Sequence, residues 1–235
     1  MAYGPGLSVV VPTLDEAHAL PGLLDDLALV PIRLEVVVAD GGSSDATVET
    51  ARARGARVVA SERGRGLQLR AGAAAARGRV LAFLHADARL DRGTRAALAG
   101  LADLPDGVAC AFALRIAASG RRYRMVEWGT ALRSRLAGLP YGDQGLVLTR
   151  ATYEAAGGFP ALPLMEDVAM VRALKRVARV KLMGEPLLVS PRRWQRDGVA
   201  RRTLGNWLLL AAYLAGVPPA RLARAYRPHG ARPHG

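Results

Sequence analysis

Val80-Leu81-Ala82-Phe83-Leu84-His85-Ala86-Asp87 sets the architecture to look for in this chain. Its apolar first part is typical of a buried β-strand, and the run stops at His85-Ala86-Asp87. If that strand is parallel to its neighbours, Asp87 lies at the carboxyl edge of a sheet, where open α/β folds bind ligands. A carboxylate at this edge can hold a divalent cation, and the cation would neutralise a diphosphate.

The sequence before this stretch alternates between strand and helix patterns. Apolar runs predict strands over Leu7–Val11, Leu34–Ala39, Arg57–Ala60 and Val80–Leu84. Between them, helical spacing with proline or glycine stops predicts three helices. They run over Leu20–Val30, from the cap at Ser44 or Asp45 through Arg54, and over Arg65–Ala76. This alternation predicts an α/β fold with a Rossmann-like, mostly parallel central sheet flanked by helices.

The second half is less regular. We expect strands over Val108–Ile116 and Leu146–Thr149, two short strands near Val180 and Leu187, and helices over Tyr123–Ala137 and Arg150–Ala156 and from Glu166 onward. These predict a short second sheet and a C-terminal helical tail.

Composition excludes several classes of protein. The 235 residues, 51% of them apolar, suit one domain with a full core. The single cysteine, Cys110, excludes a disulfide scaffold and cysteine-based zinc sites, and we expect it to be buried. The net charge of +13 comes almost entirely from dispersed arginine. Because no nucleic-acid-binding motif accompanies it, we expect no nucleic-acid partner; anionic lipid or a phosphorylated substrate fits this charge as well.

Four polar clusters follow predicted strands or open a helix: Pro12-Thr13-Leu14-Asp15-Glu16, Asp40-Gly41-Gly42-Ser43, His85-Ala86-Asp87 and Glu166-Asp167. An acid after a strand is often only a turn former or a helix cap, so each cluster alone is weak. Their order and spacing together carry the functional interpretation.

With Arg63-Gly64-Arg65-Gly66-Leu67-Gln68 and Gly157-Gly158-Phe159, these clusters resemble the motifs of family 2 glycosyltransferases of the GT-A fold. The resemblance covers roughly Leu7 to Arg193. It is closest to a small bacterial subgroup with His-Ala-Asp where most relatives carry Asp-X-Asp. It implies a single glycosyltransferase domain over 1–235, with a nucleotide-binding half (7–90), an acceptor-side half (105–195) and a helical tail (198–226).

The resemblance implies a nucleotide-sugar donor, with a UDP-sugar as the first candidate. Asp40 would bind the base or ribose, because a carboxylate accepts from N–H and hydroxyl donors. Arg65 would meet the base or diphosphate, because guanidinium matches phosphate geometry. The full set of expected donor contacts is Pro12, Thr13, Glu16, Asp40, Gly41, Gly42, Arg65, Gln68, Ala86 and Asp87.

The resemblance also implies catalytic roles. Asp87 would bind Mg²⁺ or Mn²⁺, and Asp167, beside Glu166, would be the general base of an inverting displacement. His85 replaces the first acid of the metal motif, which puts metal dependence in doubt, because imidazole is a poorer partner for Mg²⁺ than for Mn²⁺. Glu166 and Asp167 have a simpler reading as acids at a helix N-terminus.

The acceptor side is expected at Gly142, Asp143, Gln144, Arg193 and Trp194. The first three can equally form an ordinary turn. Arg192-Arg193-Trp194 sits where relatives place an arginine–tryptophan pair near the acceptor and diphosphate, and it can equally be a strand-to-helix joint with a buried tryptophan. The acceptor would be a hydroxyl or carboxyl group of an unknown molecule, with a lipid-linked one among the candidates.

The longest apolar stretch, Trp207–Val217, is shorter than the ~20 residues that a membrane span needs. With arginines on both flanks it fits an interfacial helix, and its length fits a buried core helix equally well. We expect a cytoplasmic protein, at the inner face of the cell membrane if this helix binds lipid.

Three other functions compete with glycosyl transfer. A methyltransferase on a similar sheet would want a G-x-G-like turn after its first strand, whereas Asp40-Gly41-Gly42 follows the second strand and its acid precedes the glycines. A nucleotidyltransferase on a similar fold would want a basic, glycine-rich loop after the first strand, where this chain has the acidic Pro12–Glu16. A non-catalytic protein that binds nucleotide sugars or a membrane surface would explain the missing metal acid, but Glu166-Asp167 argues against it.

Overall fold

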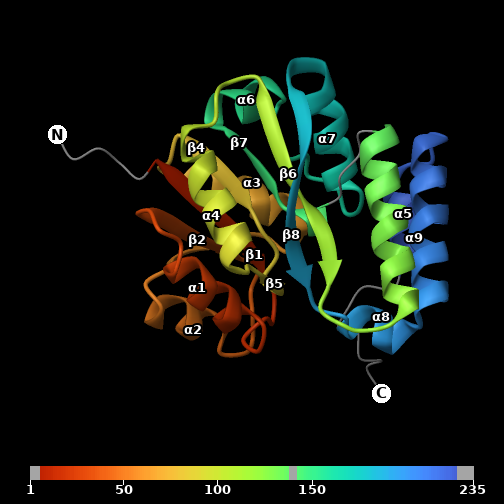
Figure 1. Cartoon of the computed structure of the whole chain (residues 1–235), viewed down its shortest axis with the longest axis horizontal. Helices are drawn as coiled ribbons and strands as arrows, with labels where there is room; N and C mark the ends of the chain where they lie inside the picture. The colour runs from red at the N-terminus through yellow and green to blue at the C-terminus, as the bar shows by residue number, and fades with distance from the viewer. Residues whose placement is uncertain (1–5, 138–141, 227–235) are drawn as a thin grey trace.

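The computed structural model describes residues 6–137 and 142–226. Its strands form one eight-stranded sheet in the order β3-β2-β1-β4-β7-β6-β8-β5, with helices on both faces (Figure 1). The elements in chain order are β1 (Leu7–Thr13), α1 (Leu20–Ala28), β2 (Leu34–Asp40), α2 (Thr47–Ala53), β3 (Arg57–Ala60), α3 (Arg65–Ala75), β4 (Val80–Phe83), β5 (Ala88–Arg89), α4 (Arg92–Gly100), η1 (Leu101–Asp103), β6 (Val108–Ile116), α5 (Arg121–Ala137), η2 (Gly142–Gln144), β7 (Leu146–Thr149), α6 (Arg150–Ala155), α7 (Glu166–Val177), β8 (Arg179–Val189), α8 (Arg192–Asp197), α9 (Val199–Leu214) and α10 (Pro219–Ala225).

The first four strands confirm the predicted parallel arrangement. β1 lies between β2 and β4, and β3 pairs with β2, all in parallel. The register places Thr13 at the end of β1 opposite Asp40 at the end of β2. The polar clusters after these strands therefore meet at one edge of the sheet, as parallel strands require.

The second half corrects two predictions. Among the described residues the expected second sheet is absent: β7 runs antiparallel between β4 and β6, and β8 extends the same sheet. The two short strands expected near Val180 and Leu187 are one strand, β8. Its pairing with β6 shifts between Leu182 and Pro186, and this irregularity interrupts the apolar pattern.

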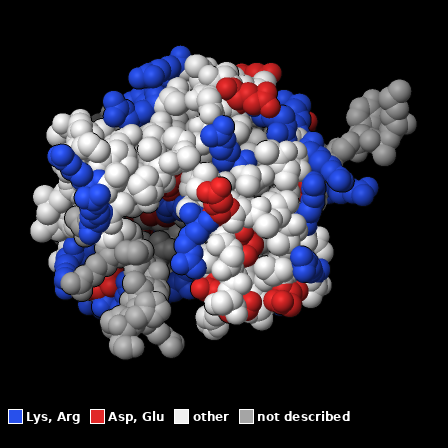
Figure 2. Space-filling model, turned by 180° about the vertical axis from the view of Figure 1, so that it is seen from behind, with Lys and Arg blue, Asp and Glu red and all other residues white. Residues whose placement is uncertain are grey.

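Lys and Arg side chains are dispersed over the face of the molecule shown in Figure 2. This agrees with the spread of arginine along the sequence. The same face is hollowed, and both acidic and basic side chains lie inside the hollow (Figure 2).

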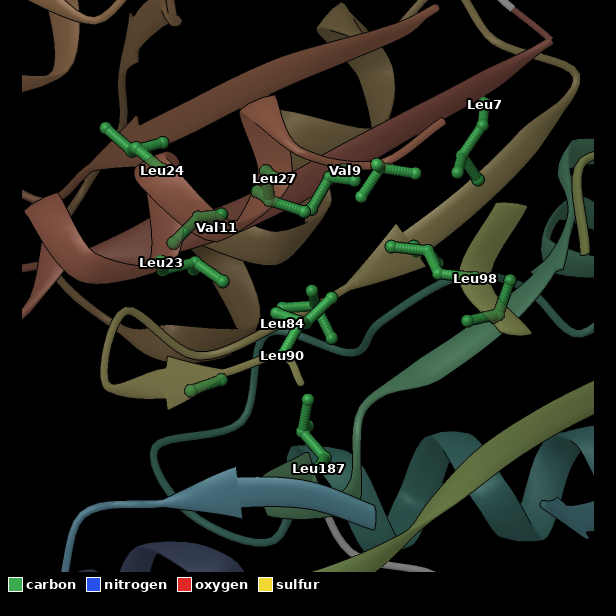
Figure 3. Packing of buried hydrophobic residues seen from close by; sticks show 14 of the residues in the cluster. Leu7, Val9, Val11, Leu23, Leu24, Leu27, Leu84, Leu90, Leu98 and Leu187 are labelled. Atoms are coloured by element: carbon green, nitrogen blue, oxygen red, sulfur yellow. The ribbon is translucent and has the colours of Figure 1, made fainter. Parts of the chain in front are cut away.

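The largest core cluster fixes the loop that follows β4. Leu23 and Leu27 of α1 pack with Val9 and Val11 of β1, and Leu84 and Leu90 join them from either side of the loop (Figure 3). Ala86 is also buried in this cluster, and so is Cys110, as expected. The buried side chains of Leu84, Ala86 and Leu90 hold the loop in place. The backbone positions of His85 and Asp87 are therefore fixed by core packing.

The C-terminal tail does not cover the sheet. Figure 1 shows α9 standing beside α5 at the end of the molecule away from α1 and α2. Within α9 only Leu210 is buried, so the core-helix reading of this segment is wrong. None of the helices in the described ranges combines the length and the apolar character needed to cross a bilayer.

Candidate active site

Asp40 organises the loop after β2. Its carboxylate accepts hydrogen bonds from Thr13 Oγ1 (3.0 Å), from the backbone N–H groups of Gly42 (3.0 Å) and Ser43 (2.9 Å), and from Ser43 Oγ. Burial alone would raise the pKa of Asp40, but these hydrogen bonds, those of Ser43 first, lower it below its ordinary value. A carboxylate has about four acceptor positions, and all are used within the chain. Asp40 therefore shapes the loop after β2, and its expected contact with a base or ribose stays a prediction.

Gln68 of α3 links the ends of β1 and β2 at the same edge of the sheet. It is buried, and its Nε2 donates to the carbonyl oxygens of Thr13 (2.5 Å) and Ala39 (3.3 Å). A Cβ on Gly41 would lie 2.9 Å from Gln68 Nε2, so a larger residue at this position would displace the end of the Gln68 side chain. Gly42 is exposed, with φ +88°, and presents its backbone outward. Gln68 and Gly41 are buried, so among these three residues only the exposed Gly42 is accessible to a ligand.

Arg65 joins α3 to the start of α7. Its Nε donates to Glu166 Oε1, and its Nη2 lies 3.5 Å from Asp167 Oδ2. The Glu166 side chain is only 2% exposed. Burial raises its pKa, Arg65 opposes that rise, and the charge of Asp167 adds to it. The guanidinium that we expected at the donor is thus engaged with two acids.

The backbone at the start of α7 separates the roles of these two acids. Met165 precedes α7 in the left-handed conformation (φ 66°), which is unusual for a residue with a side chain. Glu166 then points into the protein, whereas Asp167 is 15% exposed and lines a cavity. Asp167 therefore faces the cavity, and Glu166 holds Arg65.

Asp87 meets Arg192, the first residue of the Arg192-Arg193-Trp194 stretch that the resemblance placed near the acceptor and diphosphate. Arg192 Nη2 lies 3.6 Å from Asp87 Oδ2 and donates to both oxygens of Glu16, at 2.8 and 3.1 Å. The sequence had indicated Arg193, which lies in α8 but whose side chain is outside the described residues. The adjacent arginines gave a signal for this position, and the structure places the Arg192 guanidinium against Glu16 and Asp87.

Asp87 could hold a divalent cation only together with oxygen atoms from a bound molecule. Within the described ranges, no group of three or more His, Cys, Asp or Glu side chains could hold a metal ion. One carboxylate beside an arginine is too few ligands for Mg²⁺ or Mn²⁺. Oxygens of a bound diphosphate would have to complete the coordination.

The candidate groups converge on a cavity of about 130 Å³. Arg65, His85, Asp87 and Asp167 line it, and so does Asp143 of η2. A smaller cavity of about 20 Å³ continues past Pro12, Arg65, His85 and Asp167. The wall opposite comes from residues that the sequence did not single out for the site: Arg202, Asn206 and Leu209 of α9, and Tyr226.

Two predicted acceptor-side residues are buried, and only one of them, Trp194, lines the cavity. Gln144 is fully buried, accepts from Ser134 Oγ (2.9 Å) and donates to the carbonyl oxygen of Phe112 (3.1 Å). It ties α5 to β6 and does not face the cavity; Gly142 opens the same turn, η2. Trp194 is 8% exposed, packs in a core cluster and also lines the cavity.

The sequence model of the family described as "Glycosyl transferase family 2" matches residues 8–159, and the chain belongs to this family. An uncharacterized glycosyltransferase of Mycobacterium tuberculosis is 36% identical over 91 residues, which are 38% of this chain and 40% of that protein. A relative from Mycobacterium bovis aligns with the same values. The chain therefore matches less than half the length of these curated relatives.

Solved structures identify the fold as GT-A. A mannosyltransferase from Pyrobaculum calidifontis, in complex with GDP-mannose and Mn²⁺, aligns over 95% of this chain and 79% of its own, with a TM-score of 0.63 and 22% identity. Glucosyl-3-phosphoglycerate synthase from Mycobacterium tuberculosis, in complex with Mn²⁺, UDP and glucosyl-3-phosphoglycerate, aligns over 87% and 79%, with a TM-score of 0.58 and 22% identity.

Proposed function

We propose that this chain transfers a sugar from a nucleotide-diphospho-sugar to a hydroxyl or carboxyl group of an acceptor. One observation carries the proposal: Asp87 and Asp167, which come from opposite halves of the chain, line the same cavity together with Arg65 and His85. Convergence of separated ionisable groups on one cavity is the usual sign of a catalytic site. Family membership supports the reaction class.

The donor is proposed to lie along the edge formed by β1, β2 and β4. Gly42 would offer its backbone to the nucleoside, and Asp87 would face the diphosphate. We propose a UDP-sugar, with Mg²⁺ or Mn²⁺ held by Asp87 and the diphosphate oxygens. When bound, that cation would stabilise the charge that develops on the departing nucleoside diphosphate.

Asp167 is the proposed general base. Its carboxylate would accept the proton of the acceptor group while the acceptor oxygen attacks the anomeric carbon, which gives inversion. Arg65 Nη2, 3.5 Å from Asp167 Oδ2, would hold this carboxylate in place at the cavity. Glu166 would act through Arg65 as a positioning residue.

Arg192 is proposed to prepare the donor site. In the absence of donor it neutralises Glu16 and Asp87, which would otherwise repel each other and an incoming diphosphate. Once a diphosphate enters, the same guanidinium can pair with its oxygens. We further propose that the chain belongs to the subgroup with His-Ala-Asp as its metal motif, and that its acceptor is lipid-linked.

The test is a donor panel with matched variants. Thermal shifts with UDP, GDP and their sugars, with and without Mn²⁺, should show stabilisation by one nucleotide that Mn²⁺ increases. Asp87→Asn should lose the Mn²⁺-dependent part. Asp167→Asn should keep the donor shift but lose transfer to an acceptor hydroxyl. Asp106→Asn, at an exposed loop, is the control and should match the wild type.

Two outcomes would count against the proposal. If no nucleotide shifts the melting temperature, the donor site is wrong. If Asp167→Asn transfers sugar at the wild-type rate, another group is the base.

A further inference from the structure

Seven large apolar side chains are exposed on two neighbouring helices. On α5 these are Met125 (72% exposed), Trp128 (69%) and Leu132; on α9 they are Leu204, Trp207, Leu208 and Leu214. Nine large apolar residues are exposed in the described part of the chain, so most of them gather here. We call these seven residues the α5–α9 surface. An exposed apolar patch of this kind marks an interaction site.

The polarity of α9 is inverted. At about 100° per residue, Arg202, Asn206 and Leu209 fall on one side of the helix, and these three line the cavity. Leu204 and Leu208 fall on the opposite side and are exposed. A helix in contact with water normally turns its polar side outward, so the outer side of α9 is built to meet an apolar environment.

The same pattern holds for α5. Its buried side chains Tyr123, Thr130 and Ser134 face the protein, and Met125, Trp128 and Leu132 lie about half a turn away around the helix. Figure 1 shows that α5 and α9 run side by side in the same direction, both starting at the end near α8. Two apolar stripes are therefore adjacent, which makes the surface wider than the segment 207–217 indicated by the sequence.

The charge around this surface has one sign. Helices α5, α9 and α10 together carry nine arginines and a single acid, Glu127, which is paired with Arg124 at 2.7 Å. Arg121 and Arg122 at the start of α5 and Arg201 at the start of α9 are exposed. A partner must therefore offer both apolar volume and negative charge.

We propose that the α5–α9 surface docks on a bilayer that contains anionic lipids, with α5 and α9 lying in the headgroup region. Tryptophan with leucine on one side and arginine at the margins is the pattern of helices that lie in this interface. A second copy of the chain fits less well, because a twofold contact would bring the same arginines of both copies together.

This docking also bears on the acceptor, and that part rests on the proposed function. α9 is at once a wall of the cavity and part of the α5–α9 surface. With α9 in the headgroup region, the cavity lies within one helix diameter, about 10 Å, of the apolar side of α9 that meets the lipid. An acceptor anchored in the membrane could present its polar end to the cavity without leaving the bilayer.

The experiment is co-sedimentation of the full chain with phosphatidylcholine vesicles, with and without about 30% phosphatidylglycerol. The protein should bind the anionic vesicles at low salt, and binding should fall as added salt screens the charge. The double variant Trp128→Ser/Trp207→Ser should bind at least about ten-fold more weakly. Arg121→Gln/Arg201→Gln should bind about thirty-fold more weakly.

Leu29→Ser is the matched control, because Leu29 is 65% exposed but lies at the end of α1. Its binding should equal that of the wild type, and all variants should keep the wild-type melting temperature and donor hydrolysis. Wild-type protein that stays in the supernatant with anionic vesicles would overturn the proposal. So would a lipid-free dimer, seen by light scattering, that the tryptophan variant abolishes. Neither result depends on whether sugar transfer is observed.

Discussion

Replacing Arg65 with alanine should expose how the buried acid at the start of α7 is held. The change leaves Glu166, 2% exposed, without the guanidinium that now donates to it. Breaking a buried ion pair costs about 3–5 kcal/mol, and an exposed pair contributes about 0–1 kcal/mol. Because the Arg65 side chain is 35% exposed, we expect a loss of about 2–3 kcal/mol. For a chain of this length that lowers the melting temperature by about 5–10 °C.

The loss should depend on pH in one direction. Burial already raises the pKa of Glu166 in the folded protein, and removal of Arg65 raises that pKa further. Between the unfolded and folded pKa values the native state then binds more protons than the unfolded state, so stability falls as pH rises. The deficit relative to the wild type should therefore be small near pH 5 and largest above the folded pKa.

Urea unfolding of four proteins at pH 5 and pH 8 measures this effect. The proteins are the wild type, Arg65→Ala, Arg65→Ala with Glu166→Gln, and Arg70→Ala as an exposed control on the same helix. The second substitution removes the unpaired charge and should restore at least half of the loss at pH 8. A deficit that is largest at pH 5, or a double variant no more stable than Arg65→Ala, would refute the reasoning.

Three further changes test other parts of the structure. Gly66→Ala places a Cβ 2.3 Å from the carbonyl oxygen of Pro160 and should lower the unfolding free energy by about 2 kcal/mol or more. Gly205→Ala, in open space within α9, should raise it by up to about 1 kcal/mol; equal effects of the two in urea unfolding would contradict this. Arg192→Ala should strengthen Mn²⁺ binding without nucleotide, because two carboxylates lose their competing cation; an unchanged affinity in calorimetric titration would argue otherwise. Asp197 should titrate by NMR with a pKa of about 2, because Arg196 first and Arg202 next bond to it. The stability that this lowered pKa contributes is then present above the unfolded pKa of Asp197 and is lost as pH falls through the folded pKa. A measured pKa near the ordinary aspartate value would contradict the ion pairs with Arg196 and Arg202.

Local pattern was enough for the first half of the fold. Parallel strands are covered on both faces and read as continuous apolar runs, so β1 to β4 were found close to their observed bounds. β5 and α4 were not predicted. β5 has only two residues, and its pairing with the distant Leu188 and Val189 leaves no local signal. α4 did carry one, because Asp91 caps it by accepting from Thr94 N.

For the candidate site, the sequence indicated which positions would lie together better than it indicated their contacts. Asp87 and Asp167 line one cavity, as their places at a strand end and a helix start implied. Side-chain direction was another matter. Nothing in the sequence distinguishes an Asp40 that faces a ligand from one that bonds to its own loop, because that depends on the turn geometry of Gly42 and Ser43. The contribution of α9 to the cavity likewise depends on tertiary packing.

The position of β7 in the sheet has a consequence for how the chain is made. β4 pairs on one side with β1, but its other side is covered only by β7, which begins at Leu146. During synthesis the apolar edge of β4 stays unpaired until some sixty further residues have been added, which takes several seconds or more at ~5–20 residues per second. An open edge of this kind is a template for aggregation. A nascent chain stalled before β7 should therefore be the species that chaperones hold.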